Sequence, residues 1–388
     1  MSFISRTDAD ALIPLEVSQD IVRGVAEQSV AMQLFTRLPN MSSKVQKMAV
    51  VSALPVAYWV NGDNGVKQYS EQVWASKYLT AEEIAVIIPI PESVLDDAEY
   101  DIWGEVKPRL VESFGAVFDS AVLFGTNKPA SYPDDIKSAA IDKGYSFGKG
   151  SASFLSNGLN AISLVEGAGY IPDAIIGGAD LNALFRTIAD TDGNPISGTD
   201  LQALKKVRVV NGSFSDTVQF IVGDFKSAVF ALRQDITYKL LTEGVIQDPA
   251  DSSILYNLAQ QDMVALRAVM RIAYQLPNPV NRLQPSEDAR LPFAVCLHTA
   301  HKVVLTASPD GASGWEGDDL NIKLSADVAN AKIYYTTDNT TPTTSSTLYD
   351  PEEGITITTT KTIKALGVSN GCTNSDVLSK TFTKASAA

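Results

Sequence analysis

The longest helical pattern of hydrophobic positions runs from Asp101 to Gly125. Hydrophobic residues recur there at every fourth position, which places them on one face of an α-helix. These residues are Ile102, Val106, Leu110, Phe114 and Phe118. Asp101 is the expected N-cap, and Gly125 is the expected left-handed residue at the C-terminal end. At 1.5 Å per residue, the helix is on the order of 35 Å long. Pro108 either kinks this helix or belongs to its first turn.

A second amphipathic helix is predicted over residues 14–38, after an irregular polar segment. Its hydrophobic positions include Ile21, Val25, Val30 and Leu34. The segment that contains it either reaches over a neighbouring copy of the chain or packs on its own domain. The pattern fits both alternatives.

Two strand-like runs on either side of a dense turn signal predict a long β-hairpin. The runs are Val50–Val60, which contains Pro55, and Ser76–Ile90, and the turn residues are Asn61–Gly65. Arms of this length project roughly 35–50 Å, and an isolated two-stranded ribbon is only marginally stable in water. We therefore expect its hydrophobic side chains to contact another subunit, unless it is an ordinary hairpin of a larger sheet. The side chains expected at this contact are Tyr58, Trp59, Val60, Trp74 and Tyr78.

Helices and strands alternate after a loop rich in Pro, Gly and charged residues at 127–150. Helices are predicted over 157–166 and 180–189, and strands over 174–177, 207–210, 220–223, 228–232 and 236–241. Residues 262–275 combine apolar residues with arginine and fit a helix or a strand. The block is typical of mixed α and β structure.

Composition and charge exclude several classes of function. The chain has 388 residues, with 31 Lys and Arg against 45 Asp and Glu, and its formal net charge is −14. This balance argues against a protein that wraps nucleic acid with a basic surface. No apolar run reaches membrane-spanning length, and Met1–Asp10 lacks the apolar core of a secretion signal, so we expect synthesis in a cytoplasm and no membrane contact. Cys296 and Cys372 fit neither a disulfide framework nor a metal site.

No catalytic constellation stands out. His298 and His301 are the two histidines and lie next to a change in composition near residue 300. Gly144–Gly150 is similar to a phosphate-binding loop but is one residue short and lacks the final Ser or Thr. We expect no catalytic residue, no cofactor and no metal.

The chain changes character after residue 300. No arginine follows Arg290, and short alternating runs between turn clusters predict an all-β sandwich over 301–388. Its expected core residues are Ile333, Tyr335, Ile355, Ile357, Ile363 and Phe382. The runs Lys332–Asp338, Ser346–Tyr349 and Thr362–Ala365 resemble the immunoglobulin-like domain of chitobiases and other bacterial carbohydrate-active enzymes. This resemblance implies a surface module with weak affinity for glycans and does not imply glycosidase activity.

The order of the pieces before residue 300 resembles the major capsid proteins of tailed bacteriophages. The most specific segments are Ile221–Phe225 followed by Arg233–Thr237, and Ala265–Ala268. The resemblance implies an α+β protein of the Hong Kong 97-type fold, in which residues 262–275 form a strand. The implied organisation is an N-terminal arm and helix (1–47), an extended hairpin loop (48–90), a peripheral domain with a long spine helix (91–150), an axial domain (151–260), a return to the peripheral domain (261–300) and an immunoglobulin-like decoration domain (301–388).

The resemblance implies a structural protein and not an enzyme. Many copies would form the pentamers and hexamers of an icosahedral shell, assembled in the bacterial cytoplasm, that encloses double-stranded DNA without specific binding. Besides other copies, the implied partners are a portal and a separate scaffolding protein. Some family members crosslink their subunits through a hairpin lysine; Lys67 and Lys77 lie in that region, although exposed lysines are common on hairpins. Two alternatives stay open, an encapsulin-type compartment of the same fold and a carbohydrate-binding protein.

Overall fold

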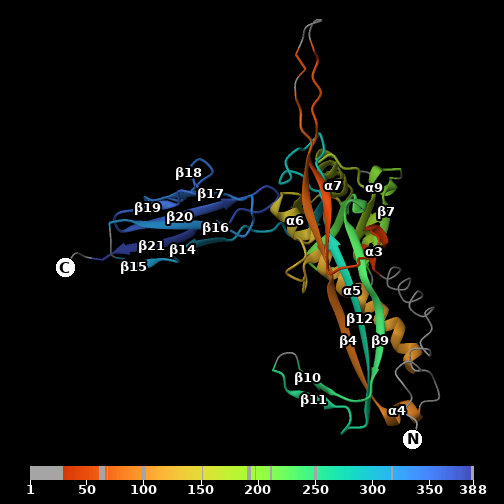
Figure 1. Ribbon diagram of the computed structural model, residues 1–388. Coiled ribbons are helices and arrows are strands. Elements are labelled where there is room, and N and C mark those ends of the chain that lie inside the picture. The colour runs from red at the N-terminus through yellow and green to blue at the C-terminus, as the bar shows by residue number, and fades with distance from the viewer. Residues whose placement is uncertain are drawn as a thin grey trace. The chain divides into compact units, whose positions relative to one another are not determined.

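The computed structural model describes residues 29–60, 66–67, 69–97, 102–150, 152–189, 194–196, 198–209, 212–248, 251–315 and 318–385. The chain divides into two compact units, and both mix helices with strands (Figure 1). The first unit consists of Met1–Asp135, Val209–Phe214 and Phe225–Asn281. The second unit consists of Ile136–Arg208, Ser215–Asp224 and Arg282–Ala388.

The first unit is built on a four-stranded sheet with the strand order β1–β9–β12–β4. Its strands are β1 (Thr36–Arg37), β9 (Val229–Leu241), β12 (Met263–Gln275) and β4 (Glu82–Pro91). β12 is antiparallel to both β9 and β4, whereas β1 runs parallel to β9. Residues 262–275, which fit a helix or a strand by periodicity, thus form the strand that the capsid resemblance implies.

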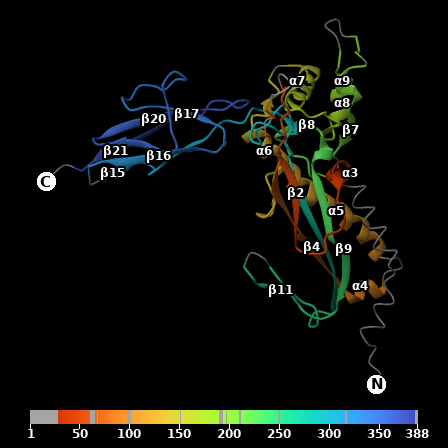
Figure 2. The same cartoon turned by 45° about the horizontal axis from the view of Figure 1, so that its top comes forward.

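Helix α5 (Ile102–Phe124) lies along this sheet in both ribbon views (Figures 1 and 2). Leu110, Phe114 and Phe118 are buried and Val106 is half-buried, as the four-residue spacing predicts. The Phe118 and Phe230 ring centroids lie 6.3 Å apart, so the hydrophobic face of the helix meets β9. The side chain of Ile102 and the predicted N-cap Asp101 lie outside the described residues.

The structure shows where Pro108 lies in this helix and how the helix ends at Gly125. Pro108 lies inside the helix rather than in its first turn. Gly125 has a φ of 75°, and its amide donates to the carbonyl of Ala121 at 3.1 Å, which is the bond that ends a helix at a left-handed glycine. A Cβ at Gly125 would lie 2.5 Å from Oδ1 of Asp135, so a side chain has no room there.

The predicted hairpin differs from the observed one in both arms. Its strands are β2 (Val45–Ala53) and β3 (Val73–Thr80), and the second predicted arm is divided at Ala81, after which β4 joins the central sheet. The prediction of one continuous arm over 76–90 is therefore wrong. The first strand ends before Pro55, which has no N–H to donate to a ladder.

The helix predicted over 14–38 is only partly within the described residues. Residues 14–28 lie outside them, and α3 covers Val30–Leu34. The prediction is wrong for the last residues, because Phe35 ends the helix and residues 36 and 37 form β1. The ring of Phe35 stacks on Phe225 and Tyr274, and the amide of Thr36 donates to the carbonyl of Ala228 at 2.9 Å, so contacts far along the chain override the local helical pattern.

The second unit contains a five-stranded sheet with the strand order β5–β13–β8–β6–β7. Its strands are β5 (Ser146–Gly148), β13 (Phe293–Leu297), β8 (Val218–Gly223), β6 (Ala174–Gly177) and β7 (Lys205–Arg208). The helices of this part are α6 (Ile136–Asp142), α7 (Phe154–Gly167), α8 (Leu181–Arg186) and α9 (Asp200–Ala203). Side chains of α7 and of strands β6, β8 and β13 form one hydrophobic cluster.

Residues 225–260 and strand β13 belong to other structural units than the sequence suggests. Residues 225–260, expected in the axial domain, belong to the first unit because the single strand β9 replaces the two predicted strands and pairs along β12. β13 was expected in the return to the peripheral domain but belongs to the second unit, because it pairs with β5 and β8.

The chain after residue 302 is all-β in its described part. A three-stranded sheet has the order β14–β16–β19, and a five-stranded sheet has the order β15–β21–β20–β17–β18. The strands are β14 (Leu305–Ser308), β15 (Ala312–Trp315), β16 (Leu320–Ala326), β17 (Lys332–Thr336), β18 (Thr347–Leu348), β19 (Ile355–Ile357), β20 (Lys361–Val368) and β21 (Leu378–Lys384).

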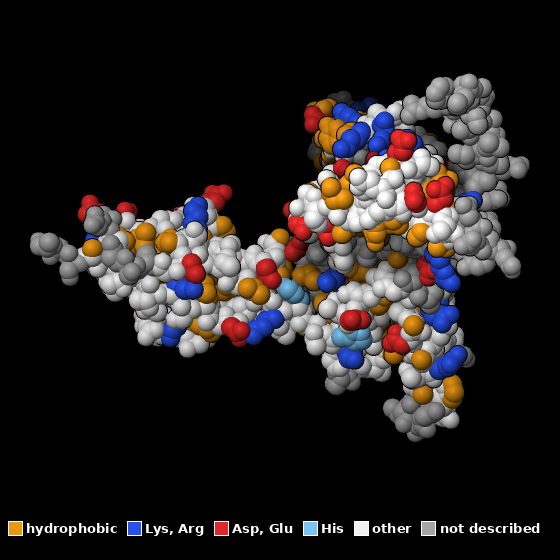
Figure 3. All heavy atoms as spheres, turned by 90° about the horizontal axis from the view of Figure 1, so that it is seen from below, with side chains coloured by type: hydrophobic (Ala, Val, Ile, Leu, Met, Phe, Trp, Pro, Cys, Tyr) orange, Lys and Arg blue, Asp and Glu red, His pale blue; other side chains and the backbone are white. Residues whose placement is uncertain are grey.

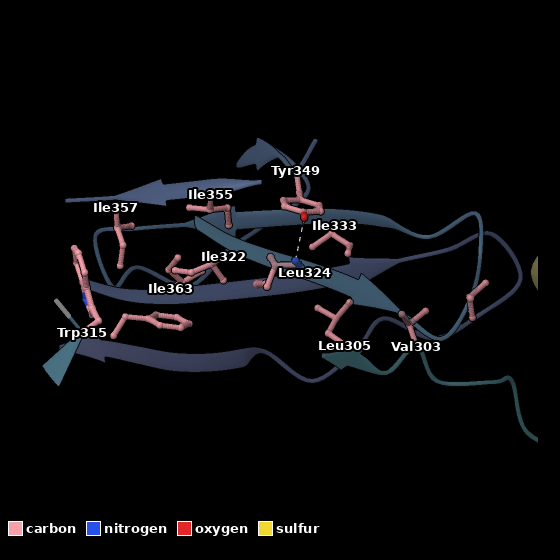
Figure 4. Packing of buried hydrophobic residues seen from close by; sticks show 13 residues of the cluster. Val303, Leu305, Trp315, Ile322, Leu324, Ile333, Tyr349, Ile355, Ile357 and Ile363 are labelled. Carbon is pink, nitrogen blue, oxygen red and sulfur yellow. Dashed lines mark hydrogen bonds between the residues drawn. The ribbon is translucent and has the colours of Figure 1, made fainter. Parts of the chain in front are cut away.

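Residues of both C-terminal sheets share one hydrophobic core (Figure 4). Five of the six predicted core residues are buried, and Tyr335 is half-buried against the cluster. The hydroxyl of Tyr349 accepts a hydrogen bond from the amide of Leu324 at 3.0 Å, which gives this buried ring a polar partner (Figure 4). A contiguous stretch of sequence thus supplies most of its own core.

Candidate assembly surfaces

The described residues contain no group of three or more His, Cys, Asp or Glu side chains placed to hold a metal ion. Among the described helices, none has the length and apolar character that a membrane span requires. His301 lies in an ion-pair geometry with Asp327, with Nε2 2.9 Å from Oδ2. This contact joins two segments at the start of the C-terminal β region, which fits a structural role for the histidine.

Among the described residues, exposed hydrophobic side chains gather on the β2–β3 hairpin. Trp59 is 99% exposed and Trp74 is 60% exposed, and Tyr58, Val60 and Tyr78 are also exposed. Five further large side chains of the same segment are exposed, namely Val45, Val56, Val66, Tyr69 and Val73. Single exposed hydrophobic residues are common, but this many on one hairpin is typical of an interaction surface. The structure thus leaves all five predicted contact residues uncovered within one subunit.

The hairpin is held together by its ladder near the base and by a side chain nearer the tip. Val51 lies opposite Trp74, and Lys47 lies opposite Tyr78. Beyond the ladder, the amide of Val56 donates to Oγ of Ser70 at 2.8 Å. Figure 1 shows the two arms extending past the end of the sheet formed by β4, β9 and β12. The aromatic side chains are therefore presented on a projecting ribbon.

A hydrophobic groove of about 480 Å³ lies between β4 and α5 in the first unit. It is lined by Val86, Ile88, Val106, Arg109, Leu110 and Ser113. Arg109 is one of these lining residues, with Nη1 3.6 Å from Oε2 of Glu112 and a side chain that is 80% exposed. The groove combines an aliphatic floor with one accessible cation, and no sequence pattern indicated it.

A second exposed hairpin was also missed by the sequence analysis. It consists of β10 (Val245–Gln247) and β11 (Ile254–Asn257), and its exposed side chains are Val245, Ile254, Leu255 and Tyr256. A turn-rich run, Gln247–Ser253, separates two short hydrophobic runs and is the signal that could have identified it. The first unit thus exposes hydrophobic residues on two separate hairpins.

Comparison with known proteins identifies the family of this chain. The profile of the phage capsid family matches residues 9–281, which is more than half of the chain. The chain belongs to the phage capsid family. The capsid resemblance of the sequence is thereby confirmed at the level of the family, and the two alternative functions, a compartment protein and a carbohydrate-binding protein, are not favoured.

Individual relatives agree with this assignment. The capsid protein is 29% identical over 274 residues to the major capsid protein of Staphylococcus phage 80alpha, covering 69% of this chain and 82% of that relative. A solved structure from Microbacterium phage Oxtober96 matches with 32% identity and a TM-score of 0.62, over 76% of this chain and 99% of the other. A structure from Mycobacterium phage Adephagia matches with 29% identity and a TM-score of 0.62, over 76% and 98%. The protein is a major capsid protein of a tailed phage, and its place is the virion shell.

The C-terminal β region has a separate match. The profile of a family described as Fn3 associated matches residues 322–382 of the capsid protein. This range covers strands β16 to β21 in large part and does not overlap the capsid match. The capsid protein therefore carries a second, distinct segment.

Proposed function

We propose that this major capsid protein closes its shell through the β2–β3 hairpin, which a neighbouring subunit covers. The observation that carries the proposal is the exposure of Trp59, whose side chain contacts almost nothing in its own subunit. Burial of a large hydrophobic side chain stabilises by about 1.5–3 kcal/mol. Because the same contact recurs at every subunit, the hairpin supplies a large share of the assembly energy.

The proposed shell is icosahedral and consists of hexamers and pentamers of this chain around double-stranded DNA. In it, the hairpin is the extended loop, the sheet of the first unit with α5 is the peripheral domain, and the five-stranded sheet of the second unit is the axial domain. A portal and a separate scaffolding protein are the further partners. The β10–β11 hairpin is a second contact between copies, because Ile254 and Leu255 are exposed there without cover from their own subunit.

The C-terminal region is proposed to be an immunoglobulin-like domain on the outer surface of the shell, with weak affinity for glycans. Two β-sheets around one core support a sandwich, and the Fn3-associated match over residues 322–382 supports a module separate from the capsid part. An outward position leaves the interior volume to DNA. Binding of the isolated domain to host cell-wall glycans, measured by pull-down against a buffer-only matrix, tests the glycan contact.

The hairpin contact is tested by the double variant Tyr58→Ser, Trp59→Ser. We expect a folded, soluble subunit with an unchanged circular dichroism spectrum and melting temperature that forms few particles in negative-stain microscopy. Ile171→Ser is the matched control, because Ile171 is 83% exposed and lies outside the hairpin; it should assemble normally. Normal assembly of the double variant would contradict the proposal, and so would a double variant that does not fold.

A further inference from the structure

We infer that one face of the C-terminal β region binds a negatively charged polysaccharide, with the ring of Tyr334 stacked against a sugar. The face is the outer side of the sheet β15–β21–β20–β17–β18, and we call it the Tyr334 face. This inference rests on the glycan contact of the proposed function. It adds the place of that contact, the residues that make it and the charge of the glycan.

Tyr334 projects away from the core because its two neighbours on β17 face inward. Ile333 is buried in the C-terminal core (Figure 4), and Tyr335 packs against the same core. Side chains alternate between the two sides of a strand, so Tyr334 lies on the outer side. On β20, Ala365 is fully buried, which places Leu366 on the outer side as well. The sheet thus presents an aromatic ring outside its own core.

The strand register places Tyr334 in a short hydrophobic row. Tyr334 lies opposite Leu348 of β18 and opposite Leu366 of β20. Side chains that face each other on neighbouring strands have Cβ atoms about 4.5–5.5 Å apart. Leu348 is 55% exposed, and Tyr334 and Leu366 are half-buried. The row spans roughly 10 Å across three strands, which suits a short stretch of a sugar chain.

Hydroxyl groups lie beside this row. Thr336 follows Tyr334 on the same side of β17, and the hydroxyl oxygens of Thr362 and Thr381 lie 3.0 Å apart across β20 and β21. A stable protein interface buries about 800 Å² per partner, which is more than a row of three side chains provides. A sugar ring has C–H groups on its faces and hydroxyl groups at its edges. An apolar row with hydroxyl groups beside it therefore fits a sugar better than a protein partner.

The charges on the Tyr334 face indicate an anionic ligand. Lys332 precedes Tyr334 by two residues on β17, and Lys364 precedes Leu366 by two residues on the antiparallel strand β20, so the two lysines lie on opposite sides of the row. None of the residues described as strands of this sheet is Asp or Glu, although the chain has 45 acidic against 31 basic residues. The first acidic residue after β17, Asp338, accepts hydrogen bonds within its own loop. Lysines without neighbouring acids on an acidic chain are complementary to a polysaccharide with carboxylate groups.

Affinity electrophoresis of the purified subunit tests the class of ligand. A native gel that contains polygalacturonate, a polysaccharide of carboxylated sugars, should slow the subunit, whereas a chain that ends at His301 should migrate unchanged. Dextran, which is neutral, and polyglutamate, which has carboxylates but no sugars, should each bind about tenfold more weakly. Equal retardation by dextran or by polyglutamate would overturn the inference, and so would the absence of retardation by polygalacturonate.

Single substitutions test the site. Tyr334→Ala should raise the apparent dissociation constant for polygalacturonate by about tenfold, whereas Tyr334→Phe keeps the ring and should bind like the native subunit. Lys332→Gln should weaken binding at low salt and have little effect at high salt, because salt screens exposed charges. Lys364 also donates to the carbonyl of Asn339 at 2.9 Å, so Lys332 is the better choice for substitution.

A matched variant and a second glycan separate the possible failures. Lys323→Gln removes an exposed lysine from β16 of the other sheet and should bind normally; an effect equal to that of Lys332→Gln would overturn the inference. If host cell-wall glycans retain the native subunit and Tyr334→Ala equally, the Tyr334 face is wrong as the site and the proposed glycan contact stands. If neither polygalacturonate nor host cell-wall glycans retain the native subunit, both fail.

Discussion

The hydroxyl of Ser29 donates a hydrogen bond of 2.7 Å to Oδ1 of Asp119, a residue ninety positions later in the chain. The same carboxylate accepts the amide N–H groups of Val30 and Ala31, each at 2.9 Å. These N–H groups open helix α3 and have no acceptor within it. Gly115 permits the approach, because a Cβ there would lie 3.2 Å from the nitrogen of Ser29. Asp119 therefore fixes the N-terminal segment to α5.

Replacement of Asp119 by Ala should lower the free energy of unfolding of the unassembled subunit by about 3 kcal/mol or more. Three buried donors then lose their acceptor, and an unsatisfied buried polar group costs about 1–3 kcal/mol. Asp119→Asn should fall between Ala and the native residue, because one oxygen remains while the new NH₂ group faces donors. Urea denaturation gives the values. Asp180→Ala is the control, because Asp180 precedes α8 without a side-chain capping bond. Equal effects of Asp119→Ala and Asp180→Ala would refute this role.

Removal of the C-terminal domain should leave the shell intact. A chain that ends at His301 retains both sheets of the capsid fold, whereas the core after residue 302 is formed mainly by its own residues. We expect particles of unchanged diameter that lack surface protrusions in cryo-electron microscopy. The isolated fragment 302–388 should unfold in one cooperative transition. Loss of assembly on truncation, or density for the domain inside the native shell, would speak against an independent outer module.

Purified subunits should bind duplex DNA weakly at physiological salt. Binding to phosphates requires clustered Lys and Arg, and the formal charge of the chain is −14. Acidic and basic side chains are interspersed on the face shown in Figure 3, and Arg271 is held by Glu83 at 2.7 Å. Fluorescence anisotropy with a labelled duplex at low and physiological salt measures this. A tight complex of the subunit with duplex DNA that weakens steeply with salt would contradict this prediction, because it would require a basic surface on the subunit.

Only one of the two thiols should react in the native protein. Cys296 is fully buried in β13, and burial raises the pKa of its thiol to about 12. At about pH 8, well below this pKa, the thiol stays protonated and is a poor nucleophile. Burial also raises the pKa of Cys372, but its side chain is only half-buried, so reagent reaches it. Ellman's reagent should titrate one thiol per native subunit and two in urea, and Cys372→Ser should abolish the native signal. Two fast native thiols would contradict the burial of Cys296.

The sequence predicts best where the information is local. The four-residue spacing from Val106 to Phe118 and the left-handed glycine at 125 were enough to define α5, because a helix depends on neighbouring residues. The exposed aromatic residues were found for a similar reason. Trp59 and Trp74 flank a strong turn signal, and large side chains beside the tip of a two-stranded ribbon have little of their own chain to pack against.

Prediction failed where the partner of a segment lies far away in the sequence. The strand-like run Ser76–Ile90 has no Gly, Pro, Asn or Asp near Ala81 that signals a turn, yet β3 pairs with β2 and β4 pairs with β12. Residues 76–90 contain no local signal for this change of the partner strand from β2 to β12. The groove was missed for the same reason, because Val86 and Val106 become neighbours only when α5 lies against the sheet.

The interleaved strand order has a consequence for synthesis on the ribosome. β4 has no partner in its sheet until β12 has been synthesised. In the other sheet, β5 and β8 are connected only through β13, which pairs with both. The four-stranded sheet is complete only after translation has passed Gln275, and the five-stranded sheet only after Leu297. Until then, backbone edges of the nascent chain stay unpaired and prone to aggregate. The strands after residue 302 pair among themselves, so this region forms its sheets without waiting for strands of the capsid portion. Synthesis of the residues after 302 thus gives the ribosome-bound capsid portion additional time to finish folding.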